Sequence, residues 1–582
     1  MAVPNVHEGC SDGHIAHALL PRPGSLSLTD RGLMGADHTS MEGLAAEFAS
    51  CLLVMRLSLP IKRGTLVAHL SANTSRSLTA LLASTALGGI AVPLNRRWSA
   101  KQSAGALHRL GCRMLVTDHG LASRACAVVQ ELKARAGAGQ GPDVELLILD
   151  GRSGQRGASE ELSLLSPPGA RTVKESQLLL PASPTCLGPP LTGPHGAAVL
   201  IFTSGTTKQP KAVGLSHAAL LSQSCAKIAT LGLSSSDTFL HCTAFFHVGG
   251  LNWALTGLEA GASQVFLPDW SPAAALQMIK DAKVTAIALV PAMAYDLVAE
   301  ARRKAGGATT APLAGMRVVL VGAGRLEGAT LAGLAALFPR AVVWAAYGLT
   351  ECASSLTFAC LREPGGDPGP AILAPARRQA GGWAVGRPPA GVEVAVLGGY
   401  GDVTRCGEGE LVTRGPHIMM GYWADGGAHR SQSMAQGWLR TGDAGAVAED
   451  GSVYLSGRLS DTIRSGGESV PAGLVEEALL AIHAVQEAVV VGLPDPRLGQ
   501  TVAAVVVLRP EPTAGDASGP EISCTTSGAV LQRLRQGGAL AGFQLPRSIT
   551  IMGAGDIPRT ATGKVRKQEL VAQLQAVRAS KL

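Results

Sequence analysis

The densest run of side chains that could do chemistry is TSGTTKQPKA, which occupies residues 203–212. It directly follows AAVLIFT, an apolar run typical of a buried strand. Small residues let backbone N–H groups approach phosphate oxygens, hydroxyl groups add donors, and a lysine adds a positive charge. The run therefore predicts a phosphate-binding loop rather than a Ser/Thr-rich surface turn. The predicted loop residues are Thr203, Ser204, Gly205, Thr206, Thr207 and Lys211.

A second run, AAYGLTEC at residues 345–352, places Thr350 and Glu351 after another strand-like segment. Magnesium prefers hard oxygen ligands, and it neutralises charge while a phosphate group leaves. A Thr-Glu pair alone is an ordinary surface feature. Combined with a phosphate loop it becomes a strong signal, and the family resemblance described next implies that Glu351 is the metal ligand.

The order of these runs closely resembles the adenylate-forming superfamily of acyl-CoA synthetases, adenylation domains and luciferases, whose phosphate loop usually reads TSGTTGxPKG. The resemblance extends from about residue 60 to the C-terminus, and Lys208 and Ala212 replace two glycines of the usual loop. It implies that the chain uses ATP, Mg²⁺ and coenzyme A to activate a small carboxylic acid. It also implies catalytic roles for Thr350, Glu351 and Lys564, the last being a mobile cation that bridges the carboxylate and the α-phosphate.

Two further segments of the large domain are nucleotide-binding by this resemblance. Tyr347 and Gly348 would lie at the adenine ring. The turn Gly322, Ala323 and Gly324 follows the strand-like run RVVLV and misses the G-x-G-x-x-G pattern by one residue, so we do not expect an NAD site there. The resemblance instead places this turn beside adenine and the acyl pocket.

The C-terminal part carries the remaining nucleotide and coenzyme A residues. By resemblance, Asp443 accepts hydrogen bonds from the ribose hydroxyls, Arg458 donates to the nucleotide, and a hinge lies between Arg458 and Asp461. Gly466 and Gly467 would let the thiol arm of coenzyme A pass close to the backbone. The segment after them lacks the usual Tyr-Pro-x-Glu, which leaves the thioester step less well supported than adenylation.

The acid itself is indicated by FFHVGG at residues 245–250, which resembles the acyl-pocket motif of the family. His247 would flank the substrate carboxylate, with Gly249 beside it; the alternative is a core histidine. The strings AVPLNRRWS, HVGGLNWAL and YGLTECASSLTF resemble o-succinylbenzoate-CoA ligases of plants and algae, which act in phylloquinone synthesis. That substrate is a di-acid, and Arg325 is the expected partner of its second carboxylate.

Composition limits the other classes of function. Lys plus Arg exceed Asp plus Glu by 50 to 43 without basic blocks, so nucleic acid is not an expected partner. The 11 cysteines form no C-x-x-C pair, which argues against zinc and a disulfide framework. No apolar stretch is long enough for a membrane span. The sequence leaves monomer and homodimer open.

The last three residues, Ser580, Lys581 and Leu582, form the tripeptide that directs proteins to peroxisomes. We expect a peroxisomal location, with a chloroplast as the alternative.

The elements that must position these residues are α/β in type. Strand-like runs alternate with helix-like ones from Gly64 onward, which favours parallel sheets flanked by helices. We expect a large N-terminal domain (residues 1–457) of α/β subdomains plus a small β-rich subdomain. A small mobile α+β domain (residues 458–582) would follow. Segments 151–196, 363–382 and 511–528 are rich in turn residues and predict surface excursions.

The predicted function is therefore an ATP-dependent acid-CoA ligase acting on o-succinylbenzoate through an acyl-adenylate. A 4-coumarate-like or medium-chain acyl-CoA ligase is the alternative enzyme. A nucleotide-binding homologue without catalysis is the alternative of another class, suggested by Lys208, Ala212 and the altered segment Pro471–Leu474.

Overall fold

The computed structural model describes most of the chain. The described residues are 37–39, 41–135, 144–149, 170–173, 193–203, 210–306, 311–326, 328–366, 383–399, 401–424, 427–429, 434–435, 437–466, 468–509, 526–559 and 565–579. Contacts divide the chain into two compact units. The first comprises Met1–Leu373, Val385–Glu393 and Thr413–Leu439, and the second comprises Ala374–Ala384, Val394–Val412 and Arg440–Leu582. The domain boundary predicted between residues 457 and 458, with a hinge beside it, stays a prediction.

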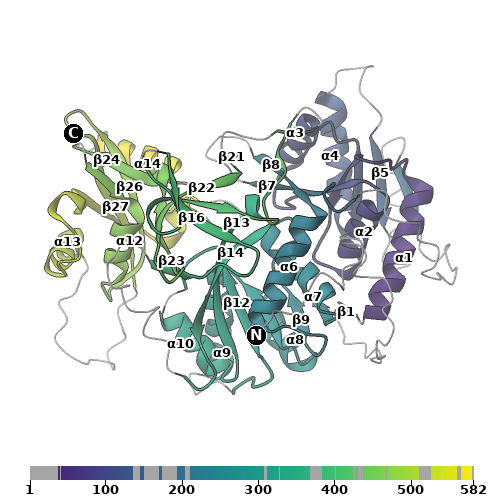
Figure 1. The fold of residues 1–582 in the computed structure, drawn as a ribbon, viewed down its shortest axis with the longest axis horizontal. Coiled ribbons are helices and arrows are strands. Elements are labelled where there is room, and N and C mark those ends of the chain that lie inside the picture. The colour runs from purple at the N-terminus through teal and green to yellow at the C-terminus, as the bar shows by residue number, and fades with distance from the viewer. Residues whose placement is uncertain are drawn as a thin grey trace. The chain divides into compact units, whose positions relative to one another are not determined.

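The first unit contains a largely parallel sheet, which has seven strands within the described residues, in the order β1-β10-β9-β11-β12-β13-β14. Its strands are β1 (Asp37–Thr39), β9 (Thr238–His241), β10 (Ser263–Phe266), β11 (Ala286–Leu289), β12 (Val318–Gly322), β13 (Val342–Leu349) and β14 (Ser354–Arg362). The helices that accompany it are α6 (His217–Leu231), α7 (Val248–Glu259), α8 (Pro272–Asp281), α9 (Pro291–Lys304) and α10 (Gly328–Leu337). In Figure 1, α6 and α7 lie side by side, and both contact β14.

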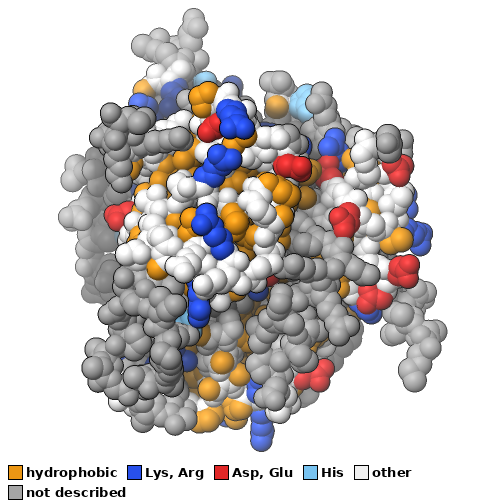
Figure 2. Space-filling view, turned by 90° about the vertical axis from the view of Figure 1, so that its left-hand side faces the viewer, with side chains coloured by type: hydrophobic (Ala, Val, Ile, Leu, Met, Phe, Trp, Pro, Cys, Tyr) orange, Lys and Arg blue, Asp and Glu red, His pale blue; other side chains and the backbone are white. Residues whose placement is uncertain are grey.

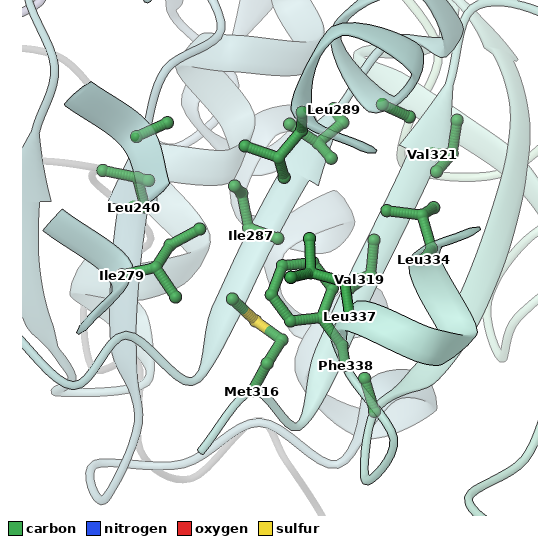
Figure 3. Close-up of a cluster of buried hydrophobic side chains, with 14 of the residues drawn as sticks. Leu240, Ile279, Ile287, Leu289, Met316, Val319, Val321, Leu334, Leu337 and Phe338 are labelled. Atoms are coloured by element: carbon green, nitrogen blue, oxygen red, sulfur yellow. The ribbon is translucent and has the colours of Figure 1, made fainter. Parts of the chain in front are cut away.

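Side chains on one face of this sheet form a buried hydrophobic cluster, which Figure 3 shows. Ile287 and Leu289 of β11 lie beside Val319 and Val321 of β12 on the same face of the sheet, and side chains of α8 and α10 cover them. Burying a large aliphatic side chain stabilises the fold by about 1.5 to 3 kcal/mol. The cluster therefore fixes the strands whose ends carry the predicted nucleotide residues.

The second sheet of the first unit has nine strands within the described residues, in the order β20-β19-β8-β7-β3-β2-β4-β5-β6. Its strands are β2 (Leu66–Leu70), β3 (Ile90–Pro93), β4 (Met114–Asp118), β5 (Glu145–Leu149), β6 (Ala170–Val173), β7 (Ala197–Thr203), β8 (Lys211–Ser216), β19 (Gly421–Ala424) and β20 (Gly427–His429). Helices α1 (Met41–Ser58) and α2 (Ser75–Ala86) pack together, as do α3 (Ala100–Leu110) and α4 (Ala122–Arg135).

Both sheets differ from the expected parallel pattern at their functional ends. β7 and β8 pair antiparallel with Thr203 opposite Lys211, so the predicted phosphate loop connects a hairpin and does not open a helix. β13 and β14 also pair antiparallel. Neither return strand has a clear local signal, because KAVGLS is short and SSLTFACLR has no clear period of two.

The second unit contains the small β-rich sheet and the C-terminal α+β part. Most residues of the β-rich sheet belong to this unit, and its strands are β15 (Trp383–Gly386), β16 (Glu393–Leu397), β17 (Val403–Thr404), β18 (Gly407–Arg414), β21 (Met434–Ala435), β22 (Trp438–Val447) and β23 (Val453–Arg458). The C-terminal sheet contains β24 (Thr462–Ser465), β25 (Glu468–Pro471), β26 (Val485–Asp495), β27 (Gly499–Leu508) and β28 (Ser548–Ile551). Its helices are α12 (Ala472–Leu480), α13 (Ser527–Gln536) and α14 (Lys567–Ala579).

These elements confirm the expected fold class of a large α/β part, a small β-rich part and a C-terminal α+β part. The predicted excursions fall mainly outside the described residues. Within the described residues, none of the helices combines the length and the apolar character needed to cross a lipid bilayer. On the face drawn in Figure 2, basic and acidic side chains are interspersed with hydrophobic ones.

Candidate active site

The predicted site residues of the first unit lie at the ends of neighbouring strands. β12 and β13 run parallel, with Gly322 opposite Ala346. The turn that starts at Gly322 therefore lies beside Tyr347 at the carboxyl edge of the sheet. β9 runs parallel to β11, which runs parallel to β12, so the segment that leads to His247 starts at the same edge. Ligands of open α/β sheets bind at this edge.

The turn after β13 requires its small residues. A Cβ atom on Gly348 would lie 1.8 Å from the carbonyl oxygen of Ser354, so a side chain there cannot fit without moving the backbone. Ala353 follows in the left-handed region with φ +53°. This tight turn holds Thr350 and Glu351 in a short 3-10 helix, where both side chains are half-buried.

Glu351 is held from two directions by the segment that leads into β19. Its backbone oxygen accepts a hydrogen bond of 2.8 Å from the N–H of Met419. Its side-chain Oε1 accepts a hydrogen bond of 2.9 Å from the hydroxyl of Tyr422. The ring of the same tyrosine lies 4.8 Å from Nζ of Lys211, measured to its centroid. The structure thus brings Lys211 and Glu351 to one side chain that the sequence had not indicated.

The oxygens at this turn fit a magnesium ion. The carboxylate of Glu351 and the hydroxyl of Thr350 are hard donors, and within the described structure Oε2 of Glu351 has no hydrogen bond. Magnesium in nucleotide sites commonly takes one or two protein carboxylates and completes its shell with phosphate and water. The donor set at Glu351 suits that arrangement.

Six predicted site residues lie outside the described residues, and their roles stay predictions. They are Ser204, Gly205, Thr206 and Thr207 of the phosphate loop, Gly467 and Lys564. Thr203 and Lys211, which flank the loop, are described at the ends of β7 and β8.

His247 precedes the first turn of α7 and lies against the ring of Phe246, with 4.5 Å between the ring centroids. Burial and, to a smaller extent, the positive charge of Arg97 lower the pKa of His247 to about 4. The imidazole is therefore neutral at physiological pH. Gly249 has open space around its Cα, whereas a Cβ on Gly250 would lie 2.3 Å from the oxygen of Ala244.

Asn73 holds the segment before His247 in place. Its Nδ2 donates to the oxygen of Thr243 at 2.8 Å, and its Oδ1 accepts from the N–H of Phe245 at 3.2 Å. Asn73 lies between β2 and α2, so these bonds join the two sheets of the first unit. A cavity of about 10 Å³ lies at this junction, which is too small for an organic acid. It is lined by His69, Ser71, Ser77, Leu81, Pro93, Leu94, Phe245 and Phe246.

Arg97 lies on a turn that is fixed on both sides of it. Nη2 of Arg96 donates to the oxygen of Pro268 at 2.8 Å and pairs with Asp269 at 2.5 Å. Trp98 contacts Phe202 edge to face, with 5.2 Å between centroids, directly before the phosphate loop. The side chain of Arg97 is exposed between these anchors, and so is that of Arg325 after β12. The sequence had indicated Arg325 but not Arg97.

The second unit contains the other described site residues. Asp443 of β22 lies opposite Arg458 of β23, and Nε of the arginine is 2.9 Å from Oδ1 of the buried aspartate. Nη1 of Arg458 also donates to the oxygen of Thr441 at 3.0 Å. Gly466 adopts φ +61° in the turn between β24 and β25, which favours glycine. The pair Asp443–Arg458 is therefore preformed, while its role toward a nucleotide stays a prediction.

Comparisons with known proteins show the family of the chain. The model of the AMP-binding enzyme family matches residues 39–423, and that of the AMP-binding enzyme C-terminal domain matches residues 474–564. The 2-succinylbenzoate–CoA ligase of Arabidopsis thaliana, described as chloroplastic/peroxisomal, is 33% identical over 89% of both chains. The indoleacetate–CoA ligase of Aromatoleum aromaticum is 29% identical over 93% of both chains.

A solved structure shows the same fold. ATP-bound MatB from Rhodopseudomonas palustris superposes with a TM-score of 0.72 over 97% of this chain and 99% of its own, at 23% identity. The family model covers well over half of the chain, including the turn that holds Glu351 and the strand that holds Lys211. The chain therefore belongs to the AMP-binding enzyme family and is an AMP-forming acid–thiol ligase.

Proposed function

We propose that the protein converts 2-succinylbenzoate to its coenzyme A thioester through an acyl-adenylate, as part of phylloquinone or menaquinone synthesis. The observation that carries this substrate is the 33% identity to a ligase of that name over 89% of both chains. The relative named for indoleacetate supports a ring-bearing acid more broadly. An aromatic mono-acid is therefore the second candidate substrate.

In the first half-reaction, a carboxylate oxygen of the acid attacks the α-phosphorus of ATP and pyrophosphate leaves. Thr203, Lys211 and the loop between them hold the phosphates. Thr350 and Glu351 would hold magnesium, which would neutralise phosphate charge. Lys564 supplies the cation that bridges the carboxylate and the α-phosphate.

Other residues orient the nucleotide and the acid. Tyr347 and Gly348 contact adenine, and the turn Gly322–Gly324 lies beside adenine and the acyl pocket. Asp443 accepts hydrogen bonds from the ribose hydroxyls, and Arg458 donates to the nucleotide. His247 lies beside the carboxylate that reacts, where a neutral imidazole donates one hydrogen bond without forming an ion pair that would hold the carboxylate back.

In the second half-reaction, the thiol of coenzyme A attacks the acyl carbon and AMP leaves. We propose that its thiol arm passes Gly466 and Gly467, where the missing side chains leave the backbone accessible. Rotation of the C-terminal part at the hinge near Asp461 would exchange Lys564 for these glycines between the two steps.

Mass-spectrometric detection of the thioester tests the proposal. The purified protein is incubated with ATP, Mg²⁺, coenzyme A and, in separate reactions, 2-succinylbenzoate, indoleacetate, 4-coumarate or a medium-chain fatty acid. We expect 2-succinylbenzoyl-CoA as the main product and its loss in Lys564→Ala, the control for adenylation. A thioester from another acid, with none from 2-succinylbenzoate, would refute the proposed substrate.

For location, we propose the peroxisome, from Ser580, Lys581 and Leu582, which lie outside the described residues. The plant relative described as chloroplastic/peroxisomal supports this, and it keeps the chloroplast as the alternative.

A further inference from the structure

We propose that Tyr422 is a positioning residue for the binding of Mg·ATP. It keeps Glu351 and Lys211 apart, so that Glu351 stays available to Mg²⁺ and Lys211 stays available to ATP. The inference rests on the proposed role of Glu351 as the metal ligand. It adds a residue 71 positions away from Glu351 to the site that binds Mg·ATP.

The backbone around Tyr422 is fixed on two sides. Gly421 and Tyr422 pair antiparallel with Gly214 and Val213 of β8, the strand that follows the phosphate loop. The N–H of Met420 donates to the oxygen of Gly214 at 2.8 Å, and that of Met419 donates to Glu351 at 2.8 Å. The segment therefore joins the strand of Lys211 to the turn of Glu351.

The hydroxyl of Tyr422 suits a metal ligand better than a basic side chain would. It donates to Oε1 of Glu351 at 2.9 Å, which fixes the plane of the carboxylate and leaves Oε2 without a hydrogen bond within the described structure. A lysine or arginine in this place would pair with the carboxylate and cancel the charge that attracts a divalent cation. A neutral donor orients the group and keeps its charge.

The ring of Tyr422 acts on Lys211. Nζ lies 4.8 Å from the ring centroid, in the range of a cation–π contact. Lys211 and Glu351 form no ion pair in the described structure, although both contact this one side chain. The ring contacts the ammonium group of Lys211, and the hydroxyl donates to the carboxylate of Glu351. Because neither interaction neutralises a charge, each charge stays available to a ligand.

Calorimetric titration of ATP into the full-length protein, once with Mg²⁺ and once with EDTA, tests the inference. In Tyr422→Phe the ring remains and only the hydroxyl is lost. We expect its ATP affinity with Mg²⁺ to fall about tenfold, the usual size for a hydrogen bond to a charged group, and to change less than about twofold in EDTA. Tyr295→Phe, the same change at an exposed tyrosine of α9, should leave both affinities as they are.

A double-mutant cycle then asks whether Tyr422 acts through Glu351. When Glu351 is already replaced by Gln, the change Tyr422→Phe should lower the ATP affinity with Mg²⁺ by less than about twofold. An equal loss with and without Mg²⁺, or the full tenfold loss in the Glu351→Gln background, would overturn the inference. The inference would also be overturned if the unmodified protein bound ATP equally well with Mg²⁺ and with EDTA.

A third variant separates the ring from the hydroxyl. Tyr422→Leu removes both, so it should weaken ATP binding in EDTA too, because Lys211 loses its partner. An unchanged affinity in EDTA would refute the role of the ring. These titrations contain neither acid nor coenzyme A, so a failure of the proposed substrate leaves their outcome unaffected.

Discussion

His247 is a neutral group at physiological pH, because burial and, to a smaller extent, the charge of Arg97 lower its pKa to about 4. A neutral imidazole gives little attraction to a second carboxylate. A di-acid substrate therefore needs a cation elsewhere for its second carboxylate. Two exposed arginines of the first unit are candidates. Arg325 follows β12, and Arg97 lies on the fixed turn after β3.

Replacing each arginine by alanine shows which one receives the second carboxylate. The variant that lacks the partner should raise KM for 2-succinylbenzoate about tenfold and leave KM for ATP unchanged. Arg56→Ala, at an exposed arginine of α1, is the matched control. An unchanged KM for the di-acid in Arg325→Ala would remove Arg325 from the site, and the same result in Arg97→Ala would remove Arg97.

Much of the site was visible in the sequence because its residues follow apolar strands directly. Thr350 and Glu351 come after β13, and Lys211 begins β8. Tyr422 and Asn73 were not visible, because their partners lie 71 and 170 positions away. A hydrogen bond between residues so far apart leaves no local pattern in the chain.

At the scale of elements, α6 and α7 contain an unusual buried pair. Lys227 of α6 is fully buried, and its Nζ donates to Oδ1 of Asn252 in α7 at 2.6 Å. The amide of Asn252 in turn donates to the oxygen of Leu220 at 2.9 Å. Burial lowers the pKa of Lys227 to about 7. The two helices therefore favour the neutral amine.

This pair predicts a rise of stability with pH. Between the pKa of about 7 in the folded chain and the ordinary 10.5, the unfolded chain binds a proton that the native one lacks. The midpoint of thermal unfolding should thus rise from about pH 7.5 to about pH 9.5 more in the unmodified protein than in Lys227→Met. Lys280→Met, at an exposed lysine of α8, should keep the full rise. Parallel curves for the unmodified protein and Lys227→Met would contradict the prediction.

Helices and strands with a clear start signal were predicted well. α3, which spans Ala100–Leu110 with Ser99 as its N-cap, lies in the stretch where strand-like and helix-like runs were expected to alternate. α1 was missed, because MEGLAAEFASCLLVMRLS is apolar on nearly all sides and shows little periodicity. The strands β8 and β14 depend on pairing with β7 and β13, which local propensity does not encode.

At the scale of the whole molecule, three buried histidines and the half-buried His247 share one electrostatic property. Burial lowers the pKa of His69 to about 3, and of His241, His247 and His417 to about 4. All four belong to the first unit. His69 and His417 bond to hydroxyl groups, with Nε2 at 2.8 Å from Ser84 Oγ and at 2.9 Å from Thr413 Oγ1 respectively.

The protein should lose stability as the pH falls from about 6.5 to about 4, because the unfolded chain gains protons there that the buried imidazoles do not accept. The decrease is measured as the midpoint of thermal unfolding at several pH values. His417→Gln should flatten the curve, since it removes one of the four groups. His108→Gln, at an exposed histidine of α3, should leave the slope unchanged. A stability that does not depend on pH in this range would refute the prediction.

The late position of β19 has a consequence for how the protein is made. The ribosome completes the strands β2 to β14 before it reaches Gly421, yet the turn of Glu351 has its backbone and side-chain partners in Met419 and Tyr422. When β14 has just left the ribosome, the nascent chain can thus bury most of the cores of both sheets. The turn of Glu351 still lacks its bonds to Met419 and Tyr422 at that stage. If Glu351 holds Mg·ATP as proposed, the bonds that fix its turn can form only after β19 has been synthesised and has paired with β8.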